Sequence, residues 1–147
     1  MSTSVENASP KARSALLRAV TIGLAVGVAQ AAAPFAFWWV APATVYAMSI
    51  AFIATVYIGF AVADGRRNVL VIEVVVATLF IVVAALGVTG SPWLLVAGFF
   101  AHGCKDLWQH RTGFVRGTRW WPPFCAAVDW VAAGILAAAI IAGWGGH

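Results

Sequence analysis

The sequence predicts an all-α membrane protein: a bundle of five transmembrane helices with a cytoplasmic N-terminus and a C-terminus on the outer side. Of its 147 residues, 63% are hydrophobic and only 10% are charged, a balance that excludes an ordinary water-soluble domain. Five apolar segments have about the length that a helix needs to cross the roughly 30 Å hydrocarbon layer. If these segments cross the membrane alternately from a cytoplasmic N-terminus, all nine Lys and Arg residues fall on or near the cytoplasmic side, as the positive-inside rule expects.

The chain divides into a cytoplasmic tail, residues 1–13, and a single domain, residues 14–147. The tail is polar and carries Lys11 and Arg13. The expected membrane spans are residues 15–33, 43–63, 69–89, 93–110 and 123–144. The basic residues fall between apolar segments and form no basic stripe on a soluble fold, so we expect no nucleic-acid partner.

The first span contains Gly23 and Gly27, a G-x-x-x-G pair. Two glycines four residues apart lie on one helix face and let another helix backbone approach closely. The partner is either a helix of the same bundle or the first span of a second copy. The pair therefore predicts a tight helix contact, and it leaves a homo-oligomer open.

The connections between spans alternate in character. Residues 34–42 hold four aromatic side chains and no charge, a composition typical of the outer membrane interface. Residues 64–68 form a charged cytoplasmic turn, and residues 90–92 form a short uncharged outer turn. The loop 111–121 is basic and ends in two tryptophans, and the prolines that follow from Pro122 suit the first turn of the last helix.

The end of the fourth span is unusual because His102, Asp106 and His110 recur there every four residues. On an α-helix, positions four apart differ by about 40° in azimuth, so the three side chains form a steep stripe on one face. The two histidines lie about 12 Å apart along the axis, so one metal ion is not expected to bind both. Asp106 can join one histidine at a single ion, or bridge two ions with one histidine on each.

Two further carboxylates are expected at a similar depth. At 1.5 Å per residue, Glu73 lies about 7 Å, Asp106 about 6 Å and Asp129 about 9 Å from the inner ends of their helices. Inserting three unpaired carboxylates into apolar spans costs about 9 kcal/mol in total. A divalent cation that binds them together with imidazole groups would neutralise this charge.

An alternative explanation needs no metal. Basic residues near the inner ends of the helices can pair with the carboxylates and form a collar of salt bridges. The expected pairs are Asp106 with Lys105 or Arg111, Glu73 with Arg66 or Arg67, and Asp129 with Arg119. The collar explains the carboxylates but gives no reason for His102, the deepest polar residue of the fourth span.

The order of these residues resembles a known pattern. The motif H-x3-D-x3-H, followed after a proline-containing loop by C-x3-D, is similar to a family of small bacterial integral membrane proteins of unknown function. The matching residues are His102, Asp106, His110, Pro123, Cys125 and Asp129. The resemblance covers about the last third of the chain. It implies a shared site and a multi-pass protein of the bacterial plasma membrane, but it carries no activity.

The favoured hypothesis is a membrane-embedded metal-dependent enzyme with its site on the cytoplasmic side. The expected metal ligands are Glu73, His102, Asp106, His110 and Asp129, and Asp106 and Glu73 are also the expected catalytic groups. Mixed imidazole and carboxylate ligation suits iron, zinc or manganese, as one ion or two. Redox iron would suit oxidation of an apolar chain, whereas zinc would activate water for hydrolysis.

The basic loop predicts the kind of substrate. Three arginines can hold a phosphate or carboxylate head group, and three tryptophans can line an apolar entry, which suits a lipid or isoprenoid molecule. The expected substrate-binding residues are Arg111, Arg116, Arg119, Trp108, Trp120 and Trp121. The same residues also fit the simpler role of positive-inside charge with an aromatic belt.

The main alternative is a transporter or accessory membrane subunit that moves protons or metal ions through the same cluster. Membrane carboxylates and histidines mark such paths as readily as they mark catalysis. A path needs polar stations across the whole membrane, however, and the outer halves of the spans offer no carboxylate, histidine or basic residue. A purely structural bundle would not explain the cost of the buried charges.

Overall fold

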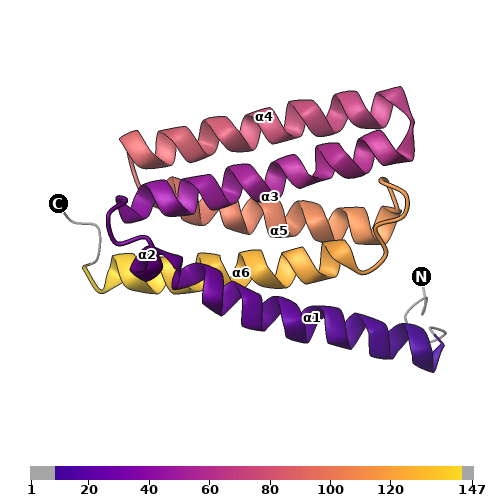
Figure 1. The fold of residues 1–147 in the computed structure, drawn as a ribbon, viewed down its shortest axis with the longest axis horizontal. Coiled ribbons are helices and arrows are strands. Elements are labelled where there is room, and N and C mark those ends of the chain that lie inside the picture. Colours follow the sequence, from indigo (N-terminus) through magenta and orange to yellow (C-terminus); the bar gives the residue numbers. More distant parts are fainter. Residues whose placement is uncertain (1–8, 144–147) are drawn as a thin grey trace, which may run out of the picture.

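The computed structural model describes residues 9–143, and the expectations that concern residues 1–8 and 144–147 lie outside it. The described part is helical and contains no strand. Its helices are α1 (Pro10–Ala31), the short α2 (Ala33–Ala36), α3 (Pro42–Asp64), α4 (Arg67–Thr89), α5 (Trp93–Thr112) and α6 (Trp121–Ile141). The five long helices run up and down and are joined by short connections (Figure 1).

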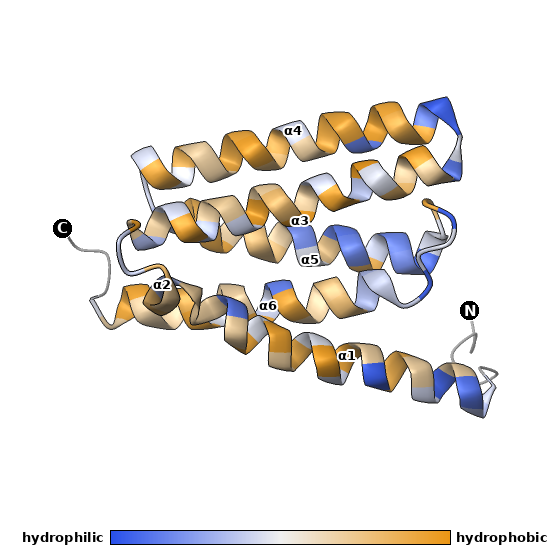
Figure 2. Cartoon of the chain, viewed as in Figure 1, coloured by the Kyte–Doolittle hydropathy of each residue, from blue (hydrophilic) through white to orange (hydrophobic). Residues whose placement is uncertain are grey.

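The helices have the composition of a multi-pass membrane protein. In the described part of the chain, α1, α3, α4 and α6 are long and apolar enough to cross a membrane. Large apolar side chains such as Leu17, Phe52 and Leu79 are exposed on them, as expected for surfaces that face lipid. The helix that falls outside this group is α5, because its second half is strongly polar (Figure 2).

The centre of the bundle is this polar helix. α5 packs against α3, α4 and α6, whereas α1 packs mainly against α6. The least apolar helix is therefore shielded by its neighbours, which is where polar membrane segments are normally found.

The helix bounds agree with the expected spans to within a few residues, apart from the start of α1. This helix begins at Pro10, where Ser9 accepts a hydrogen bond from the backbone N–H of Ala12. A side-chain cap of this kind, with proline in the first turn, favours an earlier helix start. Residues 10–13, expected in the tail, are thus the first turn of α1.

The glycine pair of the first span is used within the chain. A Cβ atom added at Gly23 would lie 2.5 Å from the carbonyl oxygen of Phe124, and one at Gly27 would lie 2.9 Å from that of Val128. Both carbonyls belong to α6. The absence of side chains at these two positions therefore allows the backbones of α1 and α6 to touch.

The basic turns lie together at one end of the bundle (Figures 1 and 2). Arg66, in the α3–α4 turn, donates hydrogen bonds to the Asp64 carboxylate and to the carbonyl oxygen of Phe114 in the α5–α6 loop. Asp64 also accepts a bond from the backbone N–H of Arg116. The hydrogen bonds with Asp64 raise the pKa of Arg66, so the turn and the loop are joined by a permanent charge.

We expect Gly23→Val to separate α1 from α6. The added Cβ would collide with backbone atoms, which cannot move away as a flexible side chain can, and overpacking of this kind typically costs about 1–3 kcal/mol. Thermal unfolding of the purified protein in detergent should show a lower midpoint for Gly23→Val. Gly134→Val is the control, because a Cβ at Gly134 of α6 meets nothing within 4 Å. Equal midpoints for the two variants would contradict this packing.

Candidate metal centre

The buried face of α5 changes character along its length. Leu95 and Phe99 lie on it in the first half, and His102, Asp106 and Gln109 lie on it in the second. The spacing of three or four residues keeps all five on one side of the helix. The polar half of this face is therefore directed into the bundle rather than toward lipid or water.

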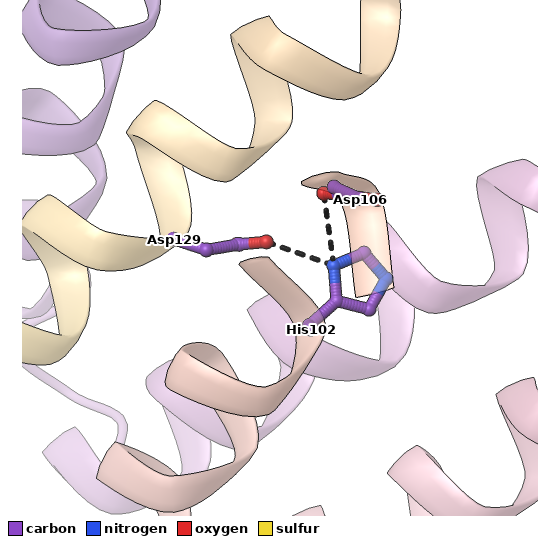
Figure 3. Close-up of side chains that lie close together, drawn as sticks. All are labelled: His102, Asp106 and Asp129. Carbon is purple, nitrogen blue, oxygen red and sulfur yellow. Dashed lines mark hydrogen bonds and ion pairs between the residues drawn. The ribbon is translucent and has the colours of Figure 1, made fainter. Parts of the chain in front are cut away.

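Three side chains from two helices meet in the bundle interior. His102 and Asp106 come from α5, and Asp129 comes from the third turn of α6. The Nδ1 atom of His102 lies 2.8 Å from Oδ2 of Asp129 and 3.4 Å from Oδ2 of Asp106 (Figure 3). One donor atom from each residue lies within 4.8 Å of the others, and their exposed fractions are 2%, 0% and 0%. We call these three residues the His–Asp–Asp group.

The group has more acceptors than donors. Both carboxylates approach the same ring nitrogen of His102, which carries at most one proton. The other ring nitrogen, Nε2, makes no hydrogen bond of ordinary geometry in the described part of the chain, nor do Oδ1 of Asp129 and either oxygen of Asp106. Buried polar atoms are normally paired, so the group has unused capacity to bind a ligand.

The geometry fits a single metal ion. Ligand atoms about 2.1 Å from one ion lie about 3.0–3.4 Å apart in octahedral and tetrahedral sites. The His102–Asp129 and His102–Asp106 separations are close to this range. The group can therefore hold a metal ion with small adjustments of its side chains.

Aromatic side chains close the group on two sides. The Phe80 ring of α4 lies 4.9 Å from the imidazole of His102 between centroids, and the Tyr57 ring of α3 lies 6.0 Å from it. Such rings exclude water and lower the local dielectric, which strengthens the attraction between the carboxylates and any cation. Cys125, one turn before Asp129 on α6, is buried and free.

Glu73 is buried but does not belong to the group. Its Oε2 accepts a hydrogen bond from Nζ of Lys105 at 2.8 Å, and its Oε1 accepts one from the side-chain amide of Gln109. The Lys105 ammonium also lies over the Tyr57 ring, 3.7 Å from its centroid, where a cation is attracted to the aromatic face. Glu73 of α4 is thus neutralised by α5.

From the sequence, Lys105 was considered only as a partner of Asp106, and Gln109 was not singled out. The sequence did contain a signal for Lys105: it is a charged residue inside an apolar span. Adjacent residues of a helix point in different directions, so Asp106 is not placed to pair with Lys105. A buried lysine without an acidic residue three or four positions away needs a counter-charge on another helix. Glu73, the isolated acid of the third span, was the candidate.

His110 lies outside the His–Asp–Asp group. It is exposed and lines hollows on the molecular surface. Positions eight apart on a helix differ by about 80°, whereas positions seven apart differ by about 20°. Gln109, seven residues after His102, therefore continues the buried face, and His110 turns away from it.

The expected substrate-binding residues do not gather at one place. Arg116, Arg119 and Trp120 line a surface hollow beside α1. The exposed Trp108 packs on Phe114, and the half-buried Trp121 packs on Phe60. Arg111 is exposed and does not line that hollow.

The collar of salt bridges is formed only in part, and with other partners. Glu73 pairs with Lys105 instead of Arg66 or Arg67. In the described part of the chain, the ion pairs of Asp106 and Asp129 are with His102. One imidazole cannot neutralise two carboxylates, so the collar does not account for this part of the site.

Comparison with known proteins gave no match: no family model, curated protein or solved structure matches the chain. The resemblance of the H-x3-D-x3-H and C-x3-D motifs to a bacterial membrane family stays a prediction. The function is therefore argued from the site alone.

We expect Glu73→Gln to destabilise the bundle strongly. The amide keeps the size of the side chain but leaves the Lys105 ammonium, whose side chain is only 12% exposed, without a counter-charge. Removing one partner of a buried ion pair typically costs about 3–5 kcal/mol. The thermal midpoint in detergent should fall. Adding Lys105→Met should restore most of the loss, because the double variant buries no charge there. A double variant no more stable than Glu73→Gln alone would show that the pair is not the cause.

Proposed function

We propose that the protein is a membrane-embedded metal-dependent enzyme that binds one ion at the His–Asp–Asp group. The observation that carries this proposal is the convergence of His102, Asp106 and Asp129, each of which brings one donor atom to within 4.8 Å of the others. Both oxygens of Asp106 and Oδ1 of Asp129 are also buried without a hydrogen bond in the described part of the chain. A divalent ion with neutral His102 and two ionised carboxylates has no net charge. Such a neutral centre is far less costly in an apolar bundle than two carboxylates sharing one imidazole.

The number of ligands favours chemistry over a structural role. Structural zinc sites usually have four protein ligands, whereas catalytic sites have three and keep a position for water or substrate. One imidazole and two carboxylates suit iron, zinc or manganese. In this proposal Asp106 is both ligand and catalytic group. Glu73, which pairs with Lys105, is the second catalytic group of the proposal.

The membrane arrangement completes the proposal. We place all five long helices across the bacterial plasma membrane, with the basic turns and the N-terminus in the cytoplasm and the C-terminus outside. The gathering of the basic turns at one end supports this orientation. The substrate is an apolar or amphipathic molecule of lipid or isoprenoid type, because the group is surrounded by membrane helices.

A second candidate function is transfer of protons or metal ions, either alone or as an accessory subunit. It is favoured by the Gln109–Glu73–Lys105 hydrogen bonds, which extend the polar region from the His–Asp–Asp group toward one end of the bundle. On the other side of His102, the buried cluster of Ile50, Leu95, Phe99 and Leu136 is apolar. A site that is polar on one side only fits an enzyme better than a complete path across the membrane.

We expect Asp106→Asn to abolish stoichiometric metal binding while it keeps the shape of the side chain. The amide removes one of the two charges that balance the ion in a low-dielectric site. Elemental analysis and thermal unfolding should be measured together on wild type and variant. His110→Ala is the control and should keep its metal, because His110 lies outside the group. A metal-free wild type, with Asp106→Asn equally or more stable, would refute the metal centre.

The membrane orientation is testable by cysteine labelling of intact cells and inverted vesicles, in a Cys104→Ser background. Arg67→Cys and Arg116→Cys should react with a membrane-impermeant maleimide only from the cytoplasmic side. Ser91→Cys, in the α4–α5 turn, should react only from outside. Labelling of Ser91→Cys from the same side as the other two would remove α4 from the set of membrane-spanning helices.

A further inference from the structure

A basic hollow lies at the end of the molecule that carries the N-terminal half of α1 and the α5–α6 loop. Its volume is about 1150 Å³, and its lining includes Arg13 of α1, His110 of α5, and Arg116, Arg119 and Trp120 of the loop. Segments far apart in the sequence thus contribute to one surface depression. In the proposed orientation, the hollow lies at the cytoplasmic end of the bundle, where lipid head groups meet a membrane protein.

Within residues 9–143, the charge of the basic hollow is not balanced by acidic side chains. No acidic residue in the described part lines it. The guanidinium groups of Arg13, Arg116 and Arg119 make no ion pair with any described residue. Arginine binds phosphate through several N–H groups at once, so three such groups around one hollow favour an anionic ligand.

An apolar trough continues from the basic hollow along the membrane-facing surface. Its volume is about 470 Å³, and Val20, Leu24, Leu107 and Trp130 are among the residues that line it. Leu16 and His110 line both depressions. From Leu16 to Leu24, α1 rises about 12 Å, so the trough has room for part of one acyl chain.

The two depressions exist because of how α1 packs. The buried residues of α1 are Ala19, Gly23, Gly27 and Ala31, and all of them lie in the middle or the second half of the helix. Before Ala19 every described residue of α1 is exposed. Figure 1 shows α1 approaching α6 in its second half and diverging toward its N-terminus. The divergence leaves a space between α1 and α5 that no side chain of the described chain fills.

From this arrangement we infer that the space between α1, α5 and α6 binds an anionic membrane lipid. The phosphate of the lipid lies in the basic hollow near Arg13, Arg116 and Arg119, and one acyl chain lies in the apolar trough beside Leu24 and Trp130. Basic pockets between membrane helices are known to bind the head groups of anionic lipids. The adjoining trough distinguishes a lipid from free phosphate, which would use the hollow alone.

The lipid site has a direct connection to the polar interior. Gln109 lines the basic hollow, and its side-chain amide donates to the buried Glu73. A head group in the hollow therefore lies next to the residue that holds the Glu73–Lys105 pair. Insofar as the bound lipid is the substrate, this inference rests on the proposed function. Binding of the lipid itself does not require the metal.

The test is native mass spectrometry of the full-length protein in a neutral, phosphate-free detergent. The probes are phosphatidylglycerol and phosphatidylcholine with identical acyl chains, added separately. Wild type should bind phosphatidylglycerol more tightly. In Arg116→Gln/Arg119→Gln, affinity for phosphatidylglycerol should fall about thirtyfold, because the effects of losing two basic groups near an anionic head group multiply in the binding constant. Arg67→Gln, which removes an exposed charge at the same end but outside the hollow, should change it less than about twofold.

A second variant tests the acyl chain. Leu24→Trp adds bulk to the trough at an exposed position of α1, and it should weaken binding of both lipids. Equal affinities of wild type for the two lipids would overturn the inference. So would full displacement of phosphatidylglycerol by inorganic phosphate, or a dimer in which a second copy covers the depressions.

The same samples separate this inference from the proposed function. Arg116→Gln/Arg119→Gln should keep its metal content, and Asp106→Asn should keep its preference for phosphatidylglycerol. Loss of lipid preference in Asp106→Asn would show that lipid binding depends on the metal group instead of the basic hollow. A protein without metal that still prefers phosphatidylglycerol would refute the enzyme and leave the lipid site standing.

Discussion

The constraint on which the structure depends is the cost of ionised groups inside an apolar bundle. α5 carries His102, Lys105 and Asp106 into a region where each unpaired charge is worth several kcal/mol. The fold answers this in two ways: it surrounds α5 with three other helices, and it supplies an acid from each of two of them. Glu73 of α4 neutralises Lys105, and Asp129 of α6 meets His102. Because Asp106 already lies beside His102, Asp129 adds a second carboxylate there, and a bound cation could balance the two.

Much of this could be predicted from the sequence. Hydropathy and turn composition predicted the five long helices, because a helix that crosses a bilayer needs about 20 apolar residues and because proline, glycine and charged residues mark helix ends. Counting residues along each helix predicted that Asp129 lies at the same depth as His102 and Asp106. Axial depth follows directly from counting residues, so it is the coordinate that a sequence describes best.

Azimuth and side-chain partners were harder to obtain. A four-residue repeat looks like one stripe, yet its drift of about 40° per step moves His110 off the face that His102 occupies. Gln109 takes that place. The partner of Glu73 depended on which side of α4 faces α5, and nothing in the sequence of an almost uniformly apolar helix specifies it. The contact of Gly23 and Gly27 with α6, and not with another helix, likewise depends on the packing order of the bundle.

The division of the buried face of α5 has an electrical consequence. Leu95, Phe99 and the residues packed around them form an apolar plug between the His–Asp–Asp group and the end of the bundle that carries the uncharged turns. In an energised membrane most of the voltage falls across such an insulating layer, since ions and water are excluded from it. In the proposed orientation, the group would therefore be held near the electrical potential of the side with the basic turns. Its access to protons and metal ions would then be insulated from conditions on the opposite side.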